Sequence, residues 1–254
     1  MMHTAIDLSL NPNSQMKLEQ CFHASPSGRW MGSGSGNLQR SKLARKIILA
    51  GHYSYDIECS THSVMLGLAE RDGLELQHLK LYVDNKSRVR KELARASGVD
   101  IAAIKNALIA KSRGATDRGE TMRGWLGDRL ESLLSNEEWQ LLSEDMSQAF
   151  NHIVDTAPKT SNRSHTVNPN GDRKAMIVEG RRIKPTQIVS HIYTGIESLA
   201  LAAMTETINS PVLPIHDCLI SAEQVDIQTL ESAIEERTGL VLKIDEEQYP
   251  EWSQ

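Results

Sequence analysis

Two aspartates in strand-like runs are the residues of this 254-residue chain best suited to chemistry. Asp56 ends the run that begins at His52, and Asp217 lies inside the apolar run from Leu213 to Ile220. Burying a carboxylate is costly unless it is paired or bound to a metal. Two carboxylates that converge from adjacent strands can hold Mg²⁺, which clamps a triphosphate and a nucleophilic hydroxyl. Either aspartate alone could instead hold a turn at a strand end, so the pair favours a metal site.

A basic segment offers a partner for such a site. Residues 99–112 carry apolar side chains at helical spacing and include Lys105, with Lys111 and Arg113 further along. Four polar residues are expected on or beside the face opposite the apolar stripe: Lys105, Asn106, Ser112 and Arg113. A positive helix face near two metals can hold triphosphate oxygens and donate a proton to pyrophosphate. A solvated helix face would give the same pattern.

Other kinds of site are not favoured. The run from Gly32 to Gly36 follows no apolar strand and lacks a closing Lys-Ser/Thr pair, so we expect a flexible loop. The histidines have no HExxH-like spacing, and no nucleophile elbow supports Ser/His/Asp hydrolysis. Three cysteines without a CxxC pair argue against a disulfide framework and a structural zinc cluster, and they favour the cytoplasm.

Charge is sorted along the chain despite a net charge of −5. Residues 28–46 carry five basic and no acidic side chains, residues 79–129 twelve and six, and residues 159–184 seven and two. From residue 217 to the end there are ten acidic and two basic residues. Such segregation favours a surface that faces a polyanion, although solvated helix faces remain an alternative.

Length and composition indicate one large domain, or one domain with a substantial lobe. The hydrophobic share of 39% and the charged share of 24% are ordinary for a soluble globular chain. No apolar run reaches the ~18 residues of a membrane helix, and no signal-peptide pattern opens the chain. We therefore expect a cytoplasmic protein that makes no membrane contact.

The elements that must position these residues are mixed in type. Strands are expected at residues 16–23, 52–58, 175–183, 212–221 and 240–244. Helices are expected at residues 38–50, 60–71, 99–112, 120–134, 136–154, 186–208 and 226–237. Loops are expected at residues 28–36 and 158–173. The lack of a clean βαβ alternation predicts an α+β fold, in which a basic helical lobe is inserted into a sheet platform.

Read in order, several short motifs resemble a known family. The stretch from His23 to Trp30, followed by Asn37-Leu38-Gln39, resembles the opening of the palm in A-family DNA polymerases, the bacterial DNA polymerase I group. The basic residues 40–46 follow, and Tyr55-Asp56-Ile57-Glu58 then resembles motif A.

The later motifs continue the same order. Lys105, with Arg113-Gly114 at the expected distance, resembles motif B, and His216-Asp217-Cys218 resembles motif C, an HD pair on a hairpin. The stretch from Val178 to Arg182 resembles the strand and turn before the last palm helix. Single-subunit phage-type RNA polymerases share motifs A, B and C and are also similar.

The resemblance implies a role for each matching residue. Asp56 and Asp217 would bind two Mg²⁺ ions, with Mn²⁺ as an alternative, and the Ile57 carbonyl would be a third ligand. Lys105 would be catalytic and contact the triphosphate, and Arg113 and Thr61 would lie at the nucleotide. The residues implied to contact nucleic acid are Arg29, Asn37, Gln39, Arg45 and His216.

Three positions depart from the family pattern. Arg113 replaces the motif B aromatic residue that stacks on the nascent base pair, and Ile101 replaces an arginine one turn before the lysine. Thr61 stands where DNA polymerases carry the glutamate that helps exclude a 2′-hydroxyl. The preference for deoxynucleotides or ribonucleotides therefore stays open.

The resemblance also implies a domain layout. Residues 1–78 would form the N-terminal part of a palm with a small antiparallel sheet, residues 79–157 a reduced helical fingers insertion, and residues 158–254 the rest of the palm. With no room for a thumb or an exonuclease, we expect weak, distributive synthesis unless an accessory subunit supplies a thumb or clamp. A phage or mobile element is the expected source.

The leading hypothesis is a minimal template-directed DNA polymerase that uses a primer–template of DNA or RNA and nucleoside triphosphates. An RNA polymerase or primase is the alternative within the same chemistry. An inactive nucleic-acid-binding palm that assists replication is the alternative from another class, and a two-metal nuclease is a third.

Overall fold

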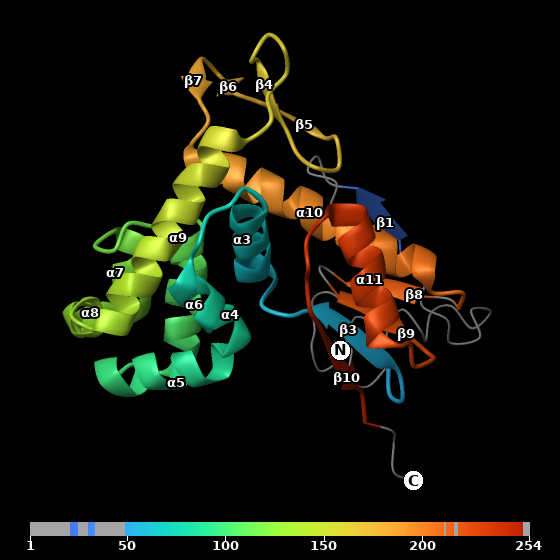
Figure 1. The fold of residues 1–254 in the computed structure, drawn as a ribbon, viewed down its shortest axis with the longest axis horizontal. Coiled ribbons are helices and arrows are strands. Elements are labelled where there is room, and N and C mark those ends of the chain that lie inside the picture. Colours follow the sequence, from blue (N-terminus) through green and yellow to red (C-terminus); the bar gives the residue numbers. More distant parts are fainter. Residues whose placement is uncertain (1–20, 25–29, 34–48, 211, 216–217, 251–254) are drawn as a thin grey trace, which may run out of the picture. The chain divides into compact units, whose positions relative to one another are not determined.

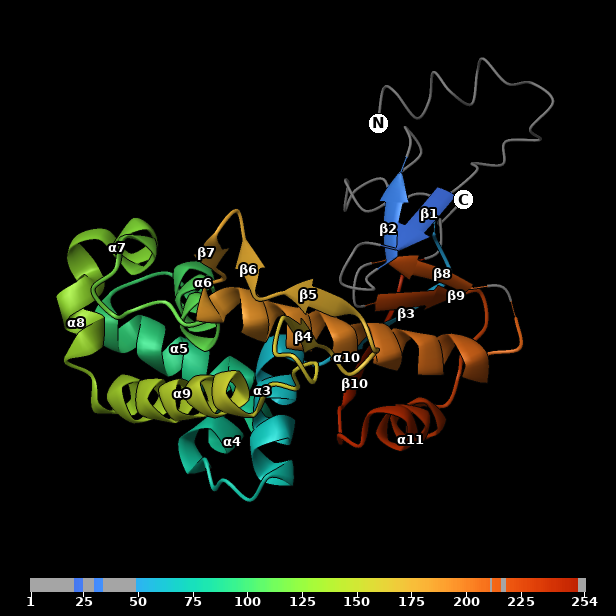
Figure 2. The ribbon, with the colours of Figure 1, turned by 90° about the horizontal axis from the view of Figure 1, so that it is seen from above.

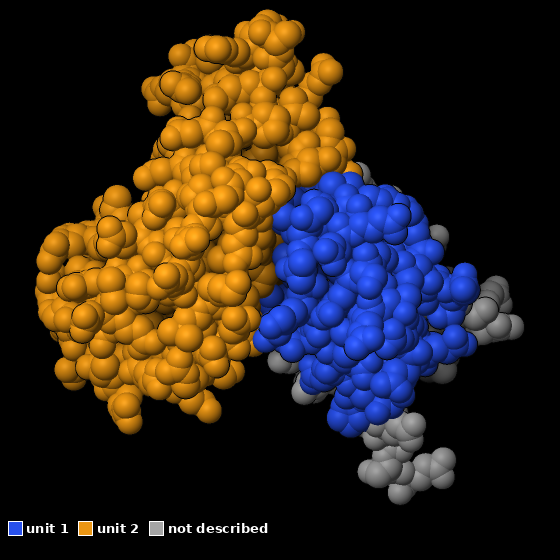
Figure 3. All heavy atoms as spheres, in the orientation of Figure 1, with its two compact units in different colours: residues 1–58, 194–254 blue, residues 59–193 orange. Residues whose placement is uncertain are grey.

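The computed structural model describes residues 21–24, 30–33, 49–210, 212–215 and 218–250. These ranges combine helices with small antiparallel sheets, which confirms the predicted α+β class (Figure 1). The chain divides into two compact units: unit 1 is residues 1–58 and 194–254, and unit 2 is residues 59–193 (Figure 3). The units change along the chain at 58/59 and 193/194 rather than at 78/79 and 157/158. The assignment of palm and fingers stays a prediction.

Unit 1 is built on a four-stranded antiparallel sheet (Figure 2). Its strands, in spatial order, are β10 (Ile244–Gln248), β3 (Tyr53–Ile57), β9 (Cys218–Ser221) and β8 (Val212–Ile215). The remaining elements of unit 1 are the hairpin β1 (Cys21–Ala24) and β2 (Trp30–Ser33), helix α11 (Ile227–Thr238) and the C-terminal part of α10 (Pro185–Thr207). A buried cluster supports the sheet and consists of Leu49, Ile215, Ile220 and Tyr249.

Unit 2 is mainly helical. Its helices are α3 (Ser60–Arg71), α4 (Gln77–Asp84), α5 (Lys86–Ser97), α6 (Ile101–Ser112), α7 (Glu120–Leu126), the 3₁₀ turn η2 (Gly127–Arg129), α8 (Leu130–Leu134), α9 (Glu137–Thr156) and the start of α10. The long helix α9 packs against α3, α4, α6 and α8. Its buried Trp139, Leu142 and Met146 fill the space between them.

Two short hairpins complete unit 2. They are β4 (His165–Val167) with β5 (Arg173–Ala175), and β6 (Ile177–Val178) with β7 (Arg181–Arg182). They lie between α9 and α10 along the chain and are drawn at the top of Figure 1.

Local sequence signals explain the confirmed helices. The predicted helix 60–71 matches α3, and the helices predicted at 99–112, 136–154, 186–208 and 226–237 correspond to α6, α9, α10 and α11. Asp100, Asn136 and Asp226 cap three of them by accepting the backbone N–H three residues on. Helix α4 lacks a local side-chain cap, and Asp145 on α9 instead accepts the His78 and Leu79 N–H groups at 2.8 and 2.9 Å. Helices α4 and α5 were not predicted from the sequence. Much of the stability of such short helices comes from tertiary packing and not from their own apolar spacing.

Several predicted segments are wrong where glycine allows a turn. The single helix 120–134 is wrong, because Gly127 adopts φ +52° and separates α7 from α8. The single strand 175–183 is wrong, because Glu179 and Gly180 have positive φ and turn the chain between β6 and β7. The apolar run 212–221 is two strands, β8 and β9, rather than one.

Other boundaries differ because strand pairing is not local. The predicted loops 28–36 and 158–173 contain β2 and β4, whose backbones pair with β1 and β5. The closing strand begins at Ile244, since Leu240 and Leu242 are buried without joining the ladder. Residues 16–20 and 38–48 lie outside the described residues, and residues 49–51 form a turn. None of the helices in the described ranges has the length and apolar character needed to cross a membrane.

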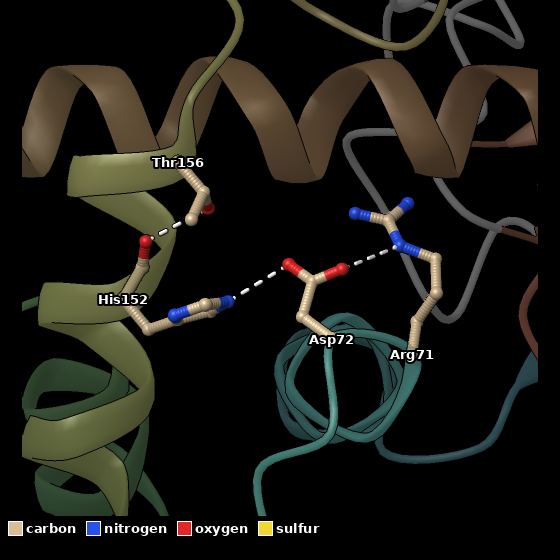
Figure 4. A network of polar contacts seen from close by, with 4 residues as sticks. All are labelled: Arg71, Asp72, His152 and Thr156. Atoms are coloured by element: carbon tan, nitrogen blue, oxygen red, sulfur yellow. Dashed lines mark hydrogen bonds and ion pairs between the residues drawn. The ribbon is translucent and has the colours of Figure 1, made fainter.

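A polar network fastens α3 to α9 in unit 2 (Figure 4). The Nε2–H of His152 donates to Oδ2 of Asp72 at 2.8 Å, and Nε of Arg71 donates to Oδ1 at 3.1 Å. These bonds, the one from His152 first, lower the pKa of Asp72 below its ordinary 3.8. The network therefore depends on an ionised Asp72.

We predict that Asp72→Asn removes part of the acid sensitivity of unfolding. A lowered carboxyl pKa stabilises the fold fully above the unfolded-state value near 3.8 and loses this effect as pH falls through the native value. The effect at neutral pH should be below ~1 kcal/mol because the pair is partly exposed. Urea titrations of both proteins at pH 7 and at pH 3 measure it. The same pH slope in both proteins would exclude a role for this carboxyl.

Candidate active site

Asp56 lies on the central strand of the unit 1 sheet. The antiparallel register pairs it with Cys218 on β9 and with Asp245 on β10. Its side chain is exposed, whereas those of Tyr55 and Ile57 on either side are buried. The alternation of a strand therefore turns the carboxylate to the face shared with Cys218 and Asp245.

Further contacts hold β3 in this register. The Tyr55 hydroxyl accepts the backbone N–H of Val225 at 2.6 Å, and burial raises the pKa of this tyrosine. The Ser54 hydroxyl and the Cys218 thiol lie 3.0 Å apart across β3 and β9. Both contacts join β3 to segments more than 160 positions away in the chain.

Asp245 is a second carboxylate of this face that its sequence context does not reveal. It is the direct cross-strand partner of Asp56, and like charges in that position repel each other. In the sequence it belongs to the acidic run Asp245-Glu246-Glu247, which has the composition of a solvated surface. Only the pairing of β10 with β3 distinguishes it from its neighbours, so no local signal could have found it.

Several predicted site residues lie outside the described residues. They are the metal candidate Asp217 and the nucleic-acid candidates Arg29, Asn37, Gln39, Arg45 and His216. Asp217 is the sequence neighbour of Cys218, the partner of Asp56. Within the described ranges, no three His, Cys, Asp or Glu side chains gather in a group that could hold a metal.

Unit 2 carries the candidate nucleotide-binding residues. Lys105 is exposed on α6, and Arg113 is exposed directly after the helix ends. Ile101, which stands where the family places an arginine, is 46% exposed at the start of the same helix. Helix α6 therefore presents a basic side chain beside an apolar one to solvent.

The prediction of one polar face on α6 is wrong for Ser112. Ser112 is fully buried, and its carbonyl accepts a hydrogen bond from the hydroxyl of Tyr193 at 3.5 Å. Lys111 is also buried, with its Nζ 2.9 Å from Oδ1 of Asp117. A buried ammonium needs such a partner. Because this partner is apparent only in the fold, the sequence alone does not show that Lys111 is buried and Lys105 exposed.

Thr61 lies in the first turn of α3, beside a cluster that orders the start of this helix. The cluster is centred on Cys59, which adopts φ +54° at the N-cap. Its Sγ lies 3.5 Å from Nδ1 of His62 and 3.8 Å from Nη2 of Arg90. Arg90 also donates two hydrogen bonds, at 2.6 and 2.9 Å, to the hydroxyl of Tyr82.

Burial sets the charge state of this cluster. It lowers the pKa of His62 to about 3, so the imidazole is neutral at neutral pH. It also raises the pKa of Tyr82, which keeps the phenol protonated beside the guanidinium of Arg90. Arg90 is thus the cation of the cluster, and it ties α5 to α4 and to the start of α3.

The turn after α6 depends on a glycine. Gly114 has φ +86°, and a Cβ added there would lie 2.5 Å from Cζ of Phe150 on α9. Its close approach to this ring sets the direction in which the chain leaves α6 next to Arg113. The packing of unit 2 therefore explains why a glycine follows Arg113.

Comparisons with known proteins find matches among solved structures. No protein-family model matches the chain, and no curated protein matches it. Among solved structures, the chain is similar to the POL domain of Pol1 from M. smegmatis in complex with DNA primer-template and dNTP. The TM-score is 0.58 at 15% identity, over 97% of this chain and 50% of that one. The chain thus has a fold similar to a polymerase domain and spans about half the length of the matched chain.

We predict that Gly114→Ala destabilises the protein by at least ~2 kcal/mol, because it combines a positive φ with a clash against Phe150. Gly124→Ala is the matched control, since this glycine of α7 has no neighbour within 4 Å of an added Cβ. The control should stabilise the helix by about 0.5 to 1 kcal/mol. Urea denaturation measures both changes. Equal effects of the two substitutions would contradict the assigned role of Gly114.

Proposed function

We propose that this chain is a template-directed nucleotidyltransferase, a minimal A-family-like DNA polymerase that adds nucleotides to a primer 3′-hydroxyl. The observation that carries the proposal is the register of β3, which pairs Asp56 with Cys218, the sequence neighbour of Asp217. The similarity of the chain to a polymerase-domain fold supports it.

The donor set fits a hard divalent cation. Asp56 is an exposed carboxylate with a second carboxylate, Asp245, directly opposite on the sheet. Carboxylate oxygens are the ligands that Mg²⁺ prefers, and two carboxylates on one face of a sheet can bind the same cation. Asp56 and Asp217 would hold the metal with the Ile57 carbonyl, and Asp245 is an added candidate. Bound Mg²⁺, or Mn²⁺ in its place, would polarise the phosphate and activate the primer hydroxyl.

The side chains of the protein would do the positioning. In the proposed reaction, the primer 3′-oxygen forms a bond to the α-phosphorus, the bond to the bridging oxygen breaks, and pyrophosphate leaves. Lys105, exposed on α6, would contact the triphosphate and supply a proton to the leaving group. Arg113 would add charge at the same nucleotide. Orientation and charge neutralisation account for most of the rate enhancement in this class of reaction.

The partners proposed are a primer–template and nucleoside triphosphates. The matched structure holds DNA primer-template and dNTP, which supports this class of partner. Arg29, Asn37, Gln39, Arg45 and His216 are proposed to contact the nucleic acid. An accessory subunit that supplies a thumb or clamp is proposed as a further partner.

We predict that Asp56→Asn and Asp217→Asn each lower Mg²⁺-dependent primer extension by more than ~100-fold. Glu236→Gln is the matched control, since it removes an exposed carboxylate on α11 of the same unit. Asp245→Asn should raise the Mg²⁺ concentration needed for half-maximal extension. A gel with primer–template and each nucleotide set measures all four variants. Extension at the wild-type rate by Asp56→Asn would refute the proposed function, and binding without extension by the wild type would favour a non-catalytic accessory.

We predict that Thr61→Glu raises the preference for dNTPs over rNTPs by about 10-fold, since a carboxylate there would disfavour a 2′-hydroxyl. Thr61→Gln is the control of equal length without the charge. Single-nucleotide incorporation with each sugar measures the ratio. If neither variant changes it, Thr61 does not lie near the sugar.

A further inference from the structure

The two hairpins of unit 2 form a strongly basic surface, here called the hairpin lobe and comprising residues 159–184. It contains seven basic residues and two acidic ones. Six of the cations are exposed and the seventh, Lys174, is half-buried; the exposed six are Lys159, Arg163, Arg173, Arg181, Arg182 and Lys184. This local excess of five positive charges lies in a chain whose net charge is negative.

The cations of the hairpin lobe are not neutralised by ion pairs within the described part of the chain. Within the described residues, none of the seven forms an ion pair with a carboxylate of this chain. Elsewhere in the same unit, Lys80 on α4 pairs with Glu70, and Arg118 in the turn before α7 pairs with Glu131, at 3.0 and 2.9 Å. Charges that repel one another and have no internal partner are most stable when an external polyanion neutralises them.

The β6–β7 hairpin is a narrow ribbon with an apolar element. Ile177 and Val178 are 65% and 53% exposed, and the register places them directly opposite Arg182 and Arg181. Since neighbouring residues of a strand point to opposite faces, each face of the ribbon carries one aliphatic side chain and one arginine.

Buried residues anchor this ribbon at its base. Met176 and Ile183 are both buried, and the Ile183 N–H donates to the Met176 carbonyl at 2.9 Å. The Met176 N–H donates to the Ser164 carbonyl at 2.8 Å, which fastens one hairpin to the other. Figure 2 shows the two hairpins as neighbours. The exposed aliphatic residues at the tip therefore stand on a supported base.

We propose that the hairpin lobe binds the backbone of a nucleic-acid duplex, with the β6–β7 ribbon in a groove. The major groove of a duplex admits a two-stranded ribbon, and cations on both sides of it can reach the flanking phosphates. Ile177 and Val178 then contact base edges or sugars without reading a sequence. The inference rests on the proposed function only for the choice of nucleic acid as the polyanion, and it concerns residues of unit 2, whereas Asp56 belongs to unit 1.

Fluorescence anisotropy with a labelled short DNA duplex and the full chain, without nucleotides, tests the proposal. We expect the double variant Arg181→Ala/Arg182→Ala to bind at least ~10-fold more weakly. We also expect the slope of log K against log salt to shrink by about 2, since each phosphate that an arginine no longer neutralises lowers it by about 0.9. The matched control Lys80→Ala/Arg118→Ala removes the same charge from ion-paired positions of the same unit and should keep the slope. Ile177→Ser/Val178→Ser should weaken binding without changing the slope.

The outcomes separate this proposal from the proposed function. Equal reductions in affinity for the arginine double variant and its control would overturn it, as would equal affinity for a single strand of the same sequence. Asp56→Asn should bind duplex as the wild type does while losing extension. Hairpin-dependent binding by a wild-type chain that extends no primer would uphold this inference and reject the polymerase. Primer extension by the wild-type chain, together with normal duplex binding by its hairpin variants, would support the proposed function and reject this inference.

Discussion

The pairing of β3 with β9 on one side and β10 on the other is the constraint on which the candidate site depends. A strand has a side-chain period of two, so a slip of one residue would turn Asp56 into the core and bring Tyr55 to the surface. Burial of Tyr55 and Ile57 opposes this slip, and the bond from Val225 N–H to the Tyr55 hydroxyl strengthens the same register. The position of one carboxylate is thus determined by the apolar residues beside it.

That register brings two acidic residues into a direct cross-strand pair. Two carboxylates, Asp56 and Asp245, stand directly opposite each other on neighbouring strands, where uncharged or oppositely charged pairs are more stable. In the sequence, Asp217 directly precedes Cys218, the strand partner of Asp56. Under the proposed function, a divalent cation bound to these carboxylates would offset any repulsion between them.

The sequence predicted those features whose causes are local. Helix α3 follows from its apolar spacing, and α6 and α9 begin where Asp100 and Asn136 cap them. The α+β class and the candidate Asp56 follow from similarly short patterns. The β4–β5 hairpin and the partner Asp245 did not follow from such patterns, because strand pairing brings together residues whose pairing is not encoded in their local sequence. Confirmed elements are therefore mostly helices, and errors are mostly strands.

The environment of a charged residue is also difficult to predict from the local sequence, even within a single helix. Lys105 and Lys111 are six residues apart on α6, and a turn of 100° per residue puts them on different faces. One is exposed, whereas the other is buried with Asp117 and serves the fold. A count of basic residues treats both as available for a polyanion. Ion pairing distinguishes the two lysines, since a cation held by an internal carboxylate attracts a ligand only weakly. The cations of the hairpin lobe have no such carboxylate partner among the described residues.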